Sequence, residues 1–173
     1  MPCFGQWDGQ TNRGTRLTKT LKRYHARESA LPNETTIALD LEGTLISNAV
    51  SQFPRPGLRG FLDFCAERFN RVCIYTAVRD EVTLQIIRTM VDEETAPSWI
   101  LQSELIQWDR TVKDLTNIPE CEITECVIVD DNPDYIVDSQ VSQWIHIEKY
   151  SSPYSKDDRE LERVQALIEQ RLT

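Results

Sequence analysis

Two short apolar runs, each closed by acidic residues, constrain the fold of this chain most. Residues 37–39 are Ile-Ala-Leu followed by Asp40, and residues 126–129 are Cys-Val-Ile-Val followed by Asp130 and Asp131. Runs this short and this apolar are typical of strands that are buried on both faces, as in a parallel sheet. The acidic residues that follow predict polar groups at the ends of these strands.

Helical patterns alternate with these strands along the chain. Apolar residues recur at helical spacing from Leu58 to Phe69 and from Val82 to Met90, and Asp80 is the expected cap of the second helix. Further expected elements are strands at 71–76, 99–101 and 144–147, a short helix from Pro133 and a final helix at 156–172. The alternation predicts an α/β fold of the Rossmann-like, three-layer kind, with a central parallel sheet covered on both faces.

In such sheets the ligand site lies beyond the carboxyl ends of the strands. Asp40, Thr76 and the pair Asp130 and Asp131 each follow or close an expected strand, so we expect them to meet at one edge. Crowded carboxylates repel one another unless a cation neutralises them. A cluster that offers only oxygen favours Mg²⁺, which in turn favours a phosphoryl-transfer site.

Residues near this edge supply the chemistry that phosphoryl transfer needs. The carboxylate of Asp40 is able to attack phosphorus and form an aspartyl phosphate. Glu42, two residues later, is placed to act as proton donor and then as base, and Gly43 allows a sharp turn between them and the following chain. Thr76 is a candidate hydrogen-bond donor to the phosphoryl oxygens, and Lys113, at an expected helix start, offsets their charge.

Charge divides the chain into two predicted units. Residues 1–30 carry six basic and two acidic residues, whereas the rest of the 173 residues carries 13 basic and 26 acidic residues. We therefore expect a basic, flexible arm at 1–30, with a short helix at 15–30, and one acidic domain at 31–173. The arm has two interpretations, a solvated leader that packs against the acidic domain or a recognition arm for an anionic partner. The net charge of -9 disfavours nonspecific nucleic-acid binding by the whole chain.

The cysteine content and the hydropathy of the chain indicate its expected subcellular location. The five cysteines are odd in number and lack Cys-x-x-Cys spacing, so a disulfide framework or structural zinc site is not expected and a reducing cytosol fits better. The first ten residues lack the apolar stretch of a secretion signal, and no apolar run approaches the length of a membrane span. We expect a protein that is neither secreted nor membrane-bound, located in the cytoplasm, or in the nucleus of a eukaryote.

Four segments resemble, in order, the four motifs of the haloacid-dehalogenase (HAD) superfamily. These segments are residues 40–45, 75–77, 113–115 and 129–133. More narrowly, the chain resembles the small RNA-polymerase C-terminal-domain phosphatases of the NLI-interacting-factor-like family, with further support from 55–62 and 157–161. The similarity covers roughly residues 35–170 and leaves out the basic arm.

The resemblance implies a role for each matching residue. Asp40 is implied as nucleophile and Mg²⁺ ligand, and Glu42 as acid/base with its backbone carbonyl on the metal. Asp131 is implied as a metal ligand and Asp130 as its direct or water-mediated support. The residues implied to hold the phosphoryl group are Thr76, Ala77 and Lys113.

Two positions depart from the family pattern. Glu42 stands where the family usually has Asp, and a shift of about 1 Å in a proton-transfer group costs on the order of 100-fold in rate. Some phosphatases of the superfamily resemble this chain in having Glu there, so activity is still expected. Asp131 stands where the narrow family usually has Asn, and its extra charge is expected to tighten Mg²⁺ binding.

The spacing between motifs predicts a domain without a large cap. Residues 44–71 hold one loop and one helix, and the 36 residues between Thr76 and Lys113 hold a helix and a short strand. Superfamily members that act on small molecules generally seal the site with a cap. An open crevice instead favours a phosphorylated side chain of a protein, or a nucleic-acid end.

Three hypotheses about function follow. The first is a Mg²⁺-dependent phosphatase that acts on phosphoprotein, at Ser/Thr or Tyr, through an aspartyl phosphate. The second is a phosphatase of nucleic-acid ends whose basic arm grips the strand. The third is a catalytically weak, phosphate-binding adaptor on the same fold, which Glu42 motivates.

Overall fold

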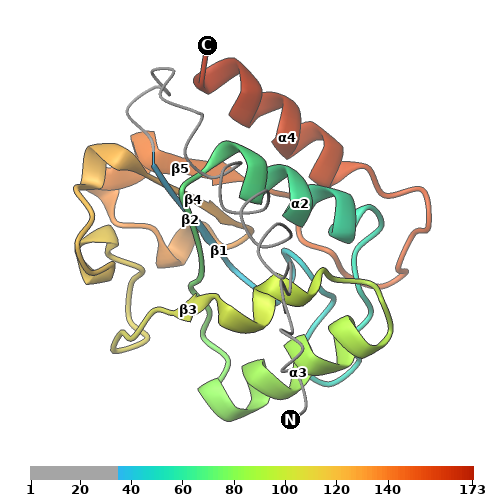
Figure 1. Ribbon diagram of the computed structural model, residues 1–173. Helices are drawn as coiled ribbons and strands as arrows, with labels where there is room; N and C mark the ends of the chain where they lie inside the picture. The colour runs from blue at the N-terminus through green and yellow to red at the C-terminus, as the bar shows by residue number, and fades with distance from the viewer. Residues whose placement is uncertain (1–34) are drawn as a thin grey trace, which may run out of the picture. The chain divides into compact units, whose positions relative to one another are not determined.

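The computed structural model describes residues 35–173, so the predicted arm at 1–30 and its expected helix at 15–30 lie outside the described residues. The predicted α/β fold with a central parallel sheet is confirmed. Five parallel strands are hydrogen-bonded in the order β3-β2-β1-β4-β5 (Figure 1). Their bounds are Thr36–Leu39 (β1), Arg71–Ile74 (β2), Glu104–Leu105 (β3), Cys126–Asp130 (β4) and Trp144–His146 (β5).

The register of the sheet brings the ends of its three central strands level. Leu39, the last residue of β1, lies opposite Ile74 of β2 on one side and Val129 of β4 on the other. The residues that follow these strands therefore emerge at the same edge. All four residues of β1 and all five of β4 are buried, as the apolar runs predict.

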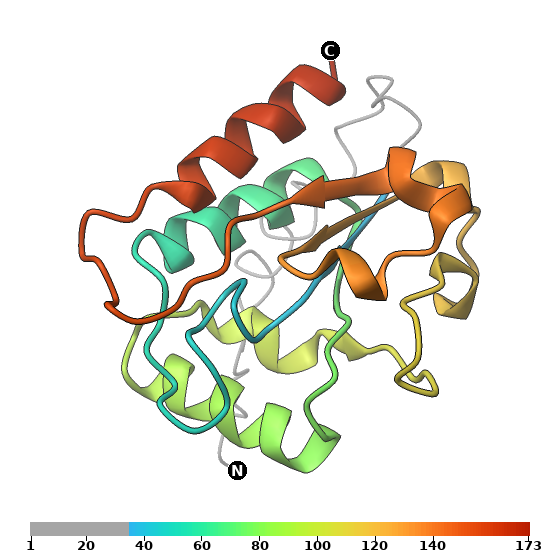
Figure 2. The same ribbon diagram turned by 180° about the vertical axis from the view of Figure 1, so that it is seen from behind.

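Within residues 35–173, three α-helices cover one face of the sheet. They are α2 (Leu58–Arg68), α3 (Asp80–Asp92) and α4 (Glu160–Arg171). Helices α2 and α4 pack side by side (Figure 2). The apolar residues Ile37, Leu39, Val127 and Val129 of the central strands form one core cluster with these helices.

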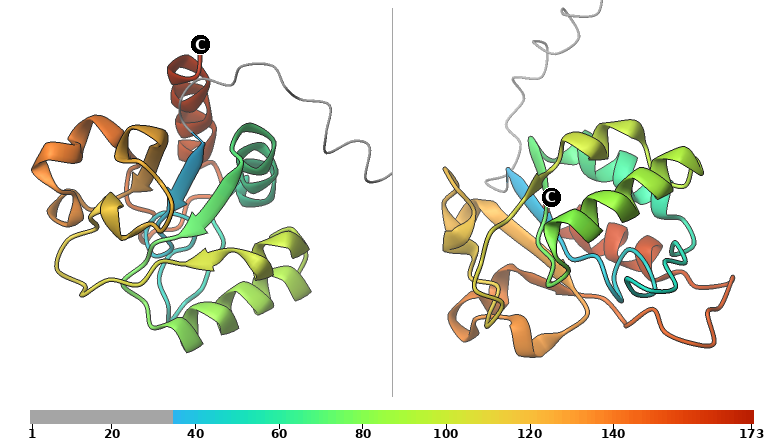
Figure 3. Two further views of the ribbon diagram at one scale, coloured as in Figure 1. Left: turned by 60° about the vertical axis from the view of Figure 1, so that its left-hand side comes forward. Right: turned by 90° about the horizontal axis from the view of Figure 1, so that it is seen from below.

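Short 3₁₀ turns and loops cover the opposite face (Figure 3, left). These turns are η2 (Leu115–Asn117), η3 (Ile123–Glu125), η4 (Pro133–Tyr135) and η5 (Asp138–Gln143). Leu115, Ile118 and Ile136 from this layer form a second core cluster with Ala38 and Ile128 of the sheet. The three-layer arrangement is confirmed, with one layer thinner than a layer of α-helices.

The predicted strand at 99–101 is wrong. The segment forms the 3₁₀ helix η1 (Ser98–Gln102), and the strand β3 comes two residues later. A short apolar run does not by itself distinguish a strand from a buried helical turn. Here Ile100 alone of the turn is buried, against the core that the α-helices form.

Other expected element boundaries also differ. Asp80 is the first residue of α3 rather than its cap, because Arg79 holds the cap position and its side chain makes no capping hydrogen bond. Lys113 does not start a helix. It forms an isolated bridge with Ile136, and η2 begins two residues later. The final helix begins at Glu160, not at residue 156.

The described part of the chain carries no cap domain. Between β1 and β2 lie a loop and α2, and between β2 and β4 lie α3, the short strand β3 and three 3₁₀ turns. Both connections contain the elements that the spacing of the motifs predicted, a loop and a helix in the first and a helix and a short strand in the second. Among residues 35–173, no helix has the length and apolar character to span a membrane.

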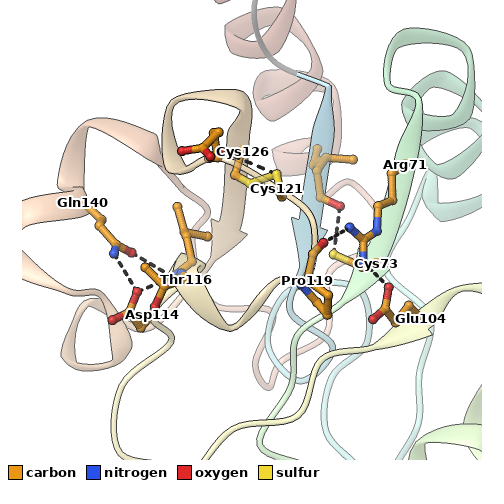
Figure 4. The surroundings of a disulfide bond; sticks show 12 residues. Arg71, Cys73, Glu104, Asp114, Thr116, Pro119, Cys121, Cys126 and Gln140 are labelled. Atoms are coloured by element: carbon orange, nitrogen blue, oxygen red, sulfur yellow. Dashed lines mark hydrogen bonds and ion pairs between the residues drawn. A yellow bond between two sulfur atoms is a disulfide. The ribbon is translucent and has the colours of Figure 1, made fainter.

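One disulfide corrects the expectation from the cysteine count. Cys121 and Cys126 are bonded across η3, which lies between them in the sequence and folds the chain back (Figure 4). An odd total of cysteines says nothing against a single local bond of this kind. Cys65 and Cys73 are free and buried, and burial raises the pKa of both thiols.

Candidate active site

Three carboxylates meet at the edge of the sheet where the central strands end. Asp40 follows β1, Asp130 closes β4 and Asp131 comes next, and one oxygen of each lies within 4.8 Å of the others. The backbone N–H of Asp40 donates to the carbonyl of Val129 at 3.0 Å, so sheet pairing continues up to the site. The predicted meeting of these carboxylates is thus present in the structure.

A cavity of about 170 Å³ opens above this cluster. The predicted residues Asp40, Glu42, Thr76 and Ala77 line it, together with Asp130 and Asp131. Three further lining residues were not predicted from the sequence: Asn132, Tyr135 and Lys149. Among the residues that sequence reasoning selected, Lys113 alone does not line the cavity.

Lys113 lies beneath the cavity and is only 1% exposed. Its Nζ donates to Oδ1 of Asp40 at 2.7 Å and also to Oδ2 of Asp130. The ammonium group therefore ties the carboxylates of two different strands together. A buried pair of carboxylates requires such a counter-charge, because the low dielectric strengthens their mutual repulsion.

Three aromatic rings surround the same ammonium group. Nζ of Lys113 lies 5.9 Å from the ring centroid of Tyr75, 5.8 Å from that of Trp108 and 5.5 Å from that of Tyr135. Trp108 stands edge-on to both tyrosine rings. We call these three rings the aromatic cage. Their π-faces attract the cation and exclude water from it.

The pKa shifts of the cluster follow from burial and from its charges. Burial and the negative charge of Asp40 raise the pKa of Asp130 to about 6, against the opposing effect of Lys113. Burial and Asp40 also raise the pKa of Asp131. Burial acts to lower the pKa of Lys113, but the charges of Asp40 and Asp130 outweigh it, so this pKa is raised. The cluster thus carries more negative charge than Lys113 alone neutralises.

Gly43 permits the turn that the motif requires. Its φ is +78°, and a Cβ at this position would lie 2.6 Å from Oδ2 of Asp131. Any side chain there would both strain the backbone and displace the carboxylate. The next residue, Thr44, donates from Oγ1 to Oδ1 of Asp131 at 3.4 Å.

Glu42 lines the cavity but lies outside the three-carboxylate cluster. Its Oε1 accepts a hydrogen bond from the backbone N–H of Ala49 at 2.5 Å. The longer side chain, compared with Asp, is thereby held by the loop that follows β1. The other carboxylate oxygen of Glu42 does not take part in this bond.

Thr76 and Ala77 follow β2 and also line the cavity. Nε1 of Trp108 donates to the carbonyl of Thr76 at 2.9 Å, and the backbone N–H of Val78 donates to Oγ1 of Thr76 at 3.2 Å. Trp108 therefore contacts both the Thr76 segment and Lys113. The three rings of the aromatic cage come from separate segments of the chain, so no local sequence pattern predicts the cage.

Arg55 supports the site from below, and its side chain is fully buried. Its guanidinium donates to the carboxylate of Asp158 at 2.8 and 3.0 Å and to the carbonyls of Gly43 and Thr44 at 3.2 Å each. It also donates to the carbonyl of Glu148 at 2.6 Å. The segments 55–62 and 157–161, which carried part of the family resemblance, thus meet through this ion pair.

A parallel α/β sheet that ends in clustered carboxylates, a lysine and a threonine is the arrangement of a HAD-superfamily phosphatase. The family model of NLI interacting factor-like phosphatases matches residues 27–173. The chain therefore belongs to this family, and the predicted enzyme class, a phosphatase, is confirmed.

A solved structure among those that match the chain shows the same fold. It is a variant of Fcp1, the fission yeast RNA polymerase II CTD phosphatase, bound to beryllium fluoride. The match has a TM-score of 0.50 at 14% identity and covers 88% of this chain and 53% of that chain. The chain thus spans about half the length of that relative, and the likeness concerns the fold alone. No curated protein sequence matches the chain.

Proposed function

We propose that this chain is a Mg²⁺-dependent phosphatase that hydrolyses phosphomonoesters through an aspartyl phosphate on Asp40. The observation that carries the proposal is the cluster of Asp40, Asp130 and Asp131 beside a cavity that Thr76 also lines. Family membership supports the phosphatase class, and the cluster supports the metal and the nucleophile.

The donor set fits Mg²⁺. Within residues 35–173 the cluster offers carboxylate oxygens and no histidine or cysteine ligand, which is the set that this ion prefers. Asp40, Asp131 and the backbone carbonyl of Glu42 would hold the ion, with Asp130 beside them. A bound Mg²⁺ would neutralise the carboxylates and the substrate oxygens.

The residues of the chain account for both chemical steps. An oxygen of Asp40 attacks phosphorus, the bond from phosphorus to the ester oxygen breaks, and Glu42 protonates the leaving oxygen. Glu42 then takes a proton from water, the water oxygen attacks phosphorus, and the bond to Asp40 breaks to release phosphate. Thr76 and Ala77, which line the cavity, hold the phosphoryl group, and Lys113 holds the Asp40 carboxylate in place during both steps.

A phosphorylated side chain of a protein suits the shape of the site. The cavity of about 170 Å³ takes a phosphoryl group and the end of a side chain, and the described residues provide no cap to enclose a whole metabolite. The name of the structurally similar Fcp1, a polymerase CTD phosphatase, agrees with this substrate class. Both phosphoserine or phosphothreonine and phosphotyrosine stay within the proposal.

The test compares p-nitrophenyl phosphate hydrolysis by wild type and Asp40→Asn, with Mg²⁺ and with a chelator. We expect activity in wild type with Mg²⁺ only, and none in Asp40→Asn. Asp63→Asn, the same substitution on the exposed side of α2, is the control and retains activity. Equal rates in wild type and Asp40→Asn would contradict the proposal. Tight phosphopeptide binding without turnover by wild type would favour the adaptor.

The nucleic-acid alternative depends on the basic arm, which lies outside the described residues, and stays a prediction. Deletion of residues 1–30 tests it, because a gripping arm makes oligonucleotide binding depend on salt. The domain division at residue 30 and the cytoplasmic location also stay predictions.

A further inference from the structure

We propose that Lys149 binds the phosphoryl group of the substrate at the mouth of the cavity. The inference rests on the proposed function, because it assigns a further substrate-binding residue to the same site. Lys149 belongs to none of the four motifs and follows β5 in a loop.

The charge of the cavity calls for such a residue. Four carboxylates line the cavity, and within residues 35–173 Lys149 is its only cationic lining residue. The ammonium of Lys113 lies under the floor, where Asp40 and Asp130 already engage it. A phosphate dianion that enters the cavity therefore meets an excess of negative charge. Lys149 is the described side chain in position to reduce this repulsion directly.

Lys149 reaches the site from the solvent side. Its Nζ lies 3.9 Å from Oδ2 of Asp131, and its side chain is 68% exposed whereas that of Asp131 is 6% exposed. The two ammonium groups thus differ in access, with Lys113 buried beneath the carboxylates and Lys149 exposed at the entrance. An exposed ammonium stays hydrated until a phosphate binds, so it carries little desolvation cost before then. On binding it gains a charge-assisted hydrogen bond.

The backbone on both sides of Lys149 is fixed to the loop that follows β1. Before it, the carbonyl of Glu148 accepts from Nη2 of Arg55 at 2.6 Å. After it, the backbone N–H of Tyr150 donates to the carbonyl of Gly43 at 2.7 Å, and Nη1 of Arg55 donates to the same carbonyl at 3.2 Å.

These contacts hold the Cα of Lys149 in one position relative to the loop that follows β1. Arg55 also stacks over the ring of Tyr150, with its Cζ 5.2 Å from the centroid. A lysine on a loose surface loop would lose more entropy on binding than this one does. Arg55 is therefore a positioning residue for Lys149 as well as for the loop.

A competing role for Lys149 is to neutralise Asp131 alone. The two roles predict different effects on the affinities for phosphate and for Mg²⁺. A phosphate-binding lysine strengthens the affinity for phosphate, whereas a lysine that only neutralises Asp131 weakens the affinity for Mg²⁺ by competing for the carboxylate. Binding measurements on both ions therefore separate them.

The experiment measures the dissociation constants of inorganic phosphate, in the presence of Mg²⁺, and of Mg²⁺ alone by calorimetry on the full chain. The variants are Lys149→Met and Lys149→Arg. The control is Lys156→Met, which removes an exposed lysine from the same segment. KM and kcat for p-nitrophenyl phosphate are measured alongside.

We expect Lys149→Met to weaken phosphate binding about tenfold, as for the loss of one charge-assisted hydrogen bond. We also expect it to raise KM more than it lowers kcat. Lys149→Arg restores most of the affinity, and Lys156→Met has no effect. Mg²⁺ binding by Lys149→Met is unchanged or tighter.

Unchanged phosphate affinity in Lys149→Met would overturn the inference, as would a change confined to Mg²⁺ affinity. Absence of phosphate binding by wild type would overturn it as well. Failure of the proposed function is distinguishable, because full activity of Asp40→Asn would refute the nucleophile while the phosphate affinities still report on Lys149.

Discussion

Substitution of Asp158 by Asn tests the buried ion pair on which the site is built. Both carboxylate oxygens of Asp158 accept from Arg55, at 2.8 and 3.0 Å, and the arginine side chain has no exposed surface. The substitution keeps the size of the side chain but removes its charge. Arg55 then stays buried without a counter-ion.

The structure sets the expected magnitude. Removal of one partner of a buried ion pair costs about 3–5 kcal/mol in unfolding free energy. Arg55 keeps the carbonyls of Gly43, Thr44 and Glu148 as acceptors, so we expect a loss near the lower end, about 3 kcal/mol. That is a large part of the stability of a domain, typically about 5–15 kcal/mol.

The difference in unfolding free energy between wild type and Asp158→Asn is expected to shrink as the pH falls. Burial acts to raise the pKa of Asp158, but the hydrogen bonds and charge of Arg55 outweigh it, so this pKa is lowered. A carboxyl whose pKa is lowered in the folded state stabilises the fold above its unfolded pKa of about 3.9 and loses that contribution at lower pH. The two unfolding free energies are therefore expected to converge below about pH 4.

Urea unfolding at about pH 7 and about pH 3 measures this difference. Asp157→Asn is the matched control, because it removes the same charge from the exposed neighbour. We expect the control to change stability by less than about 0.5 kcal/mol. A loss below about 1 kcal/mol in Asp158→Asn, or a difference that grows as the pH falls, would refute the reasoning.

Three further substitutions test other parts of the site. Gly43→Ala adds a Cβ 2.6 Å from a carboxylate oxygen of the cluster at a φ of +78°, so we expect a loss of about 1–3 kcal/mol in urea unfolding and weaker Mg²⁺ binding by calorimetry. Lys113→Met is expected to abolish turnover. Its metal-free unfolding free energy is expected to rise as the pH falls toward 5, because the pKa of Asp130, already raised to about 6, rises further without its counter-charge. Trp108→Leu removes the donor to the Thr76 carbonyl and one ring of the aromatic cage, so kcat is expected to fall on the order of tenfold while circular dichroism shows the fold retained. An unchanged kcat in Trp108→Leu would contradict its role.

The sequence was sufficient to predict the sheet and the centre of the site because both depend on strand ends. Asp40, Thr76, Asp130 and Asp131 each lie at or just beyond a buried strand, and parallel pairing in register brings such positions to one edge. The predicted strand at 99–101 failed because three apolar residues fit a buried turn equally well.

The supporting residues depend on contacts that no local pattern specifies. Arg55 meets Asp158, 103 positions away, and the carbonyl of Glu148, 93 positions away. The segments that contain Arg55 and Asp158 carried part of the family resemblance, but no pattern in the sequence shows that they meet. Lys149 has the local sequence of an ordinary surface lysine, and its place at the cavity follows only from how the chain folds back after β5.

Location of the phosphoryl group in the reaction intermediate tests the central claim most directly. Wild type is mixed with a phosphomonoester and Mg²⁺, quenched in acid, digested and mapped by mass spectrometry. The account predicts phosphate on the peptide that contains Asp40, and none when Mg²⁺ is omitted or Asp40 is replaced by Asn. Phosphate on a different residue during turnover would contradict it.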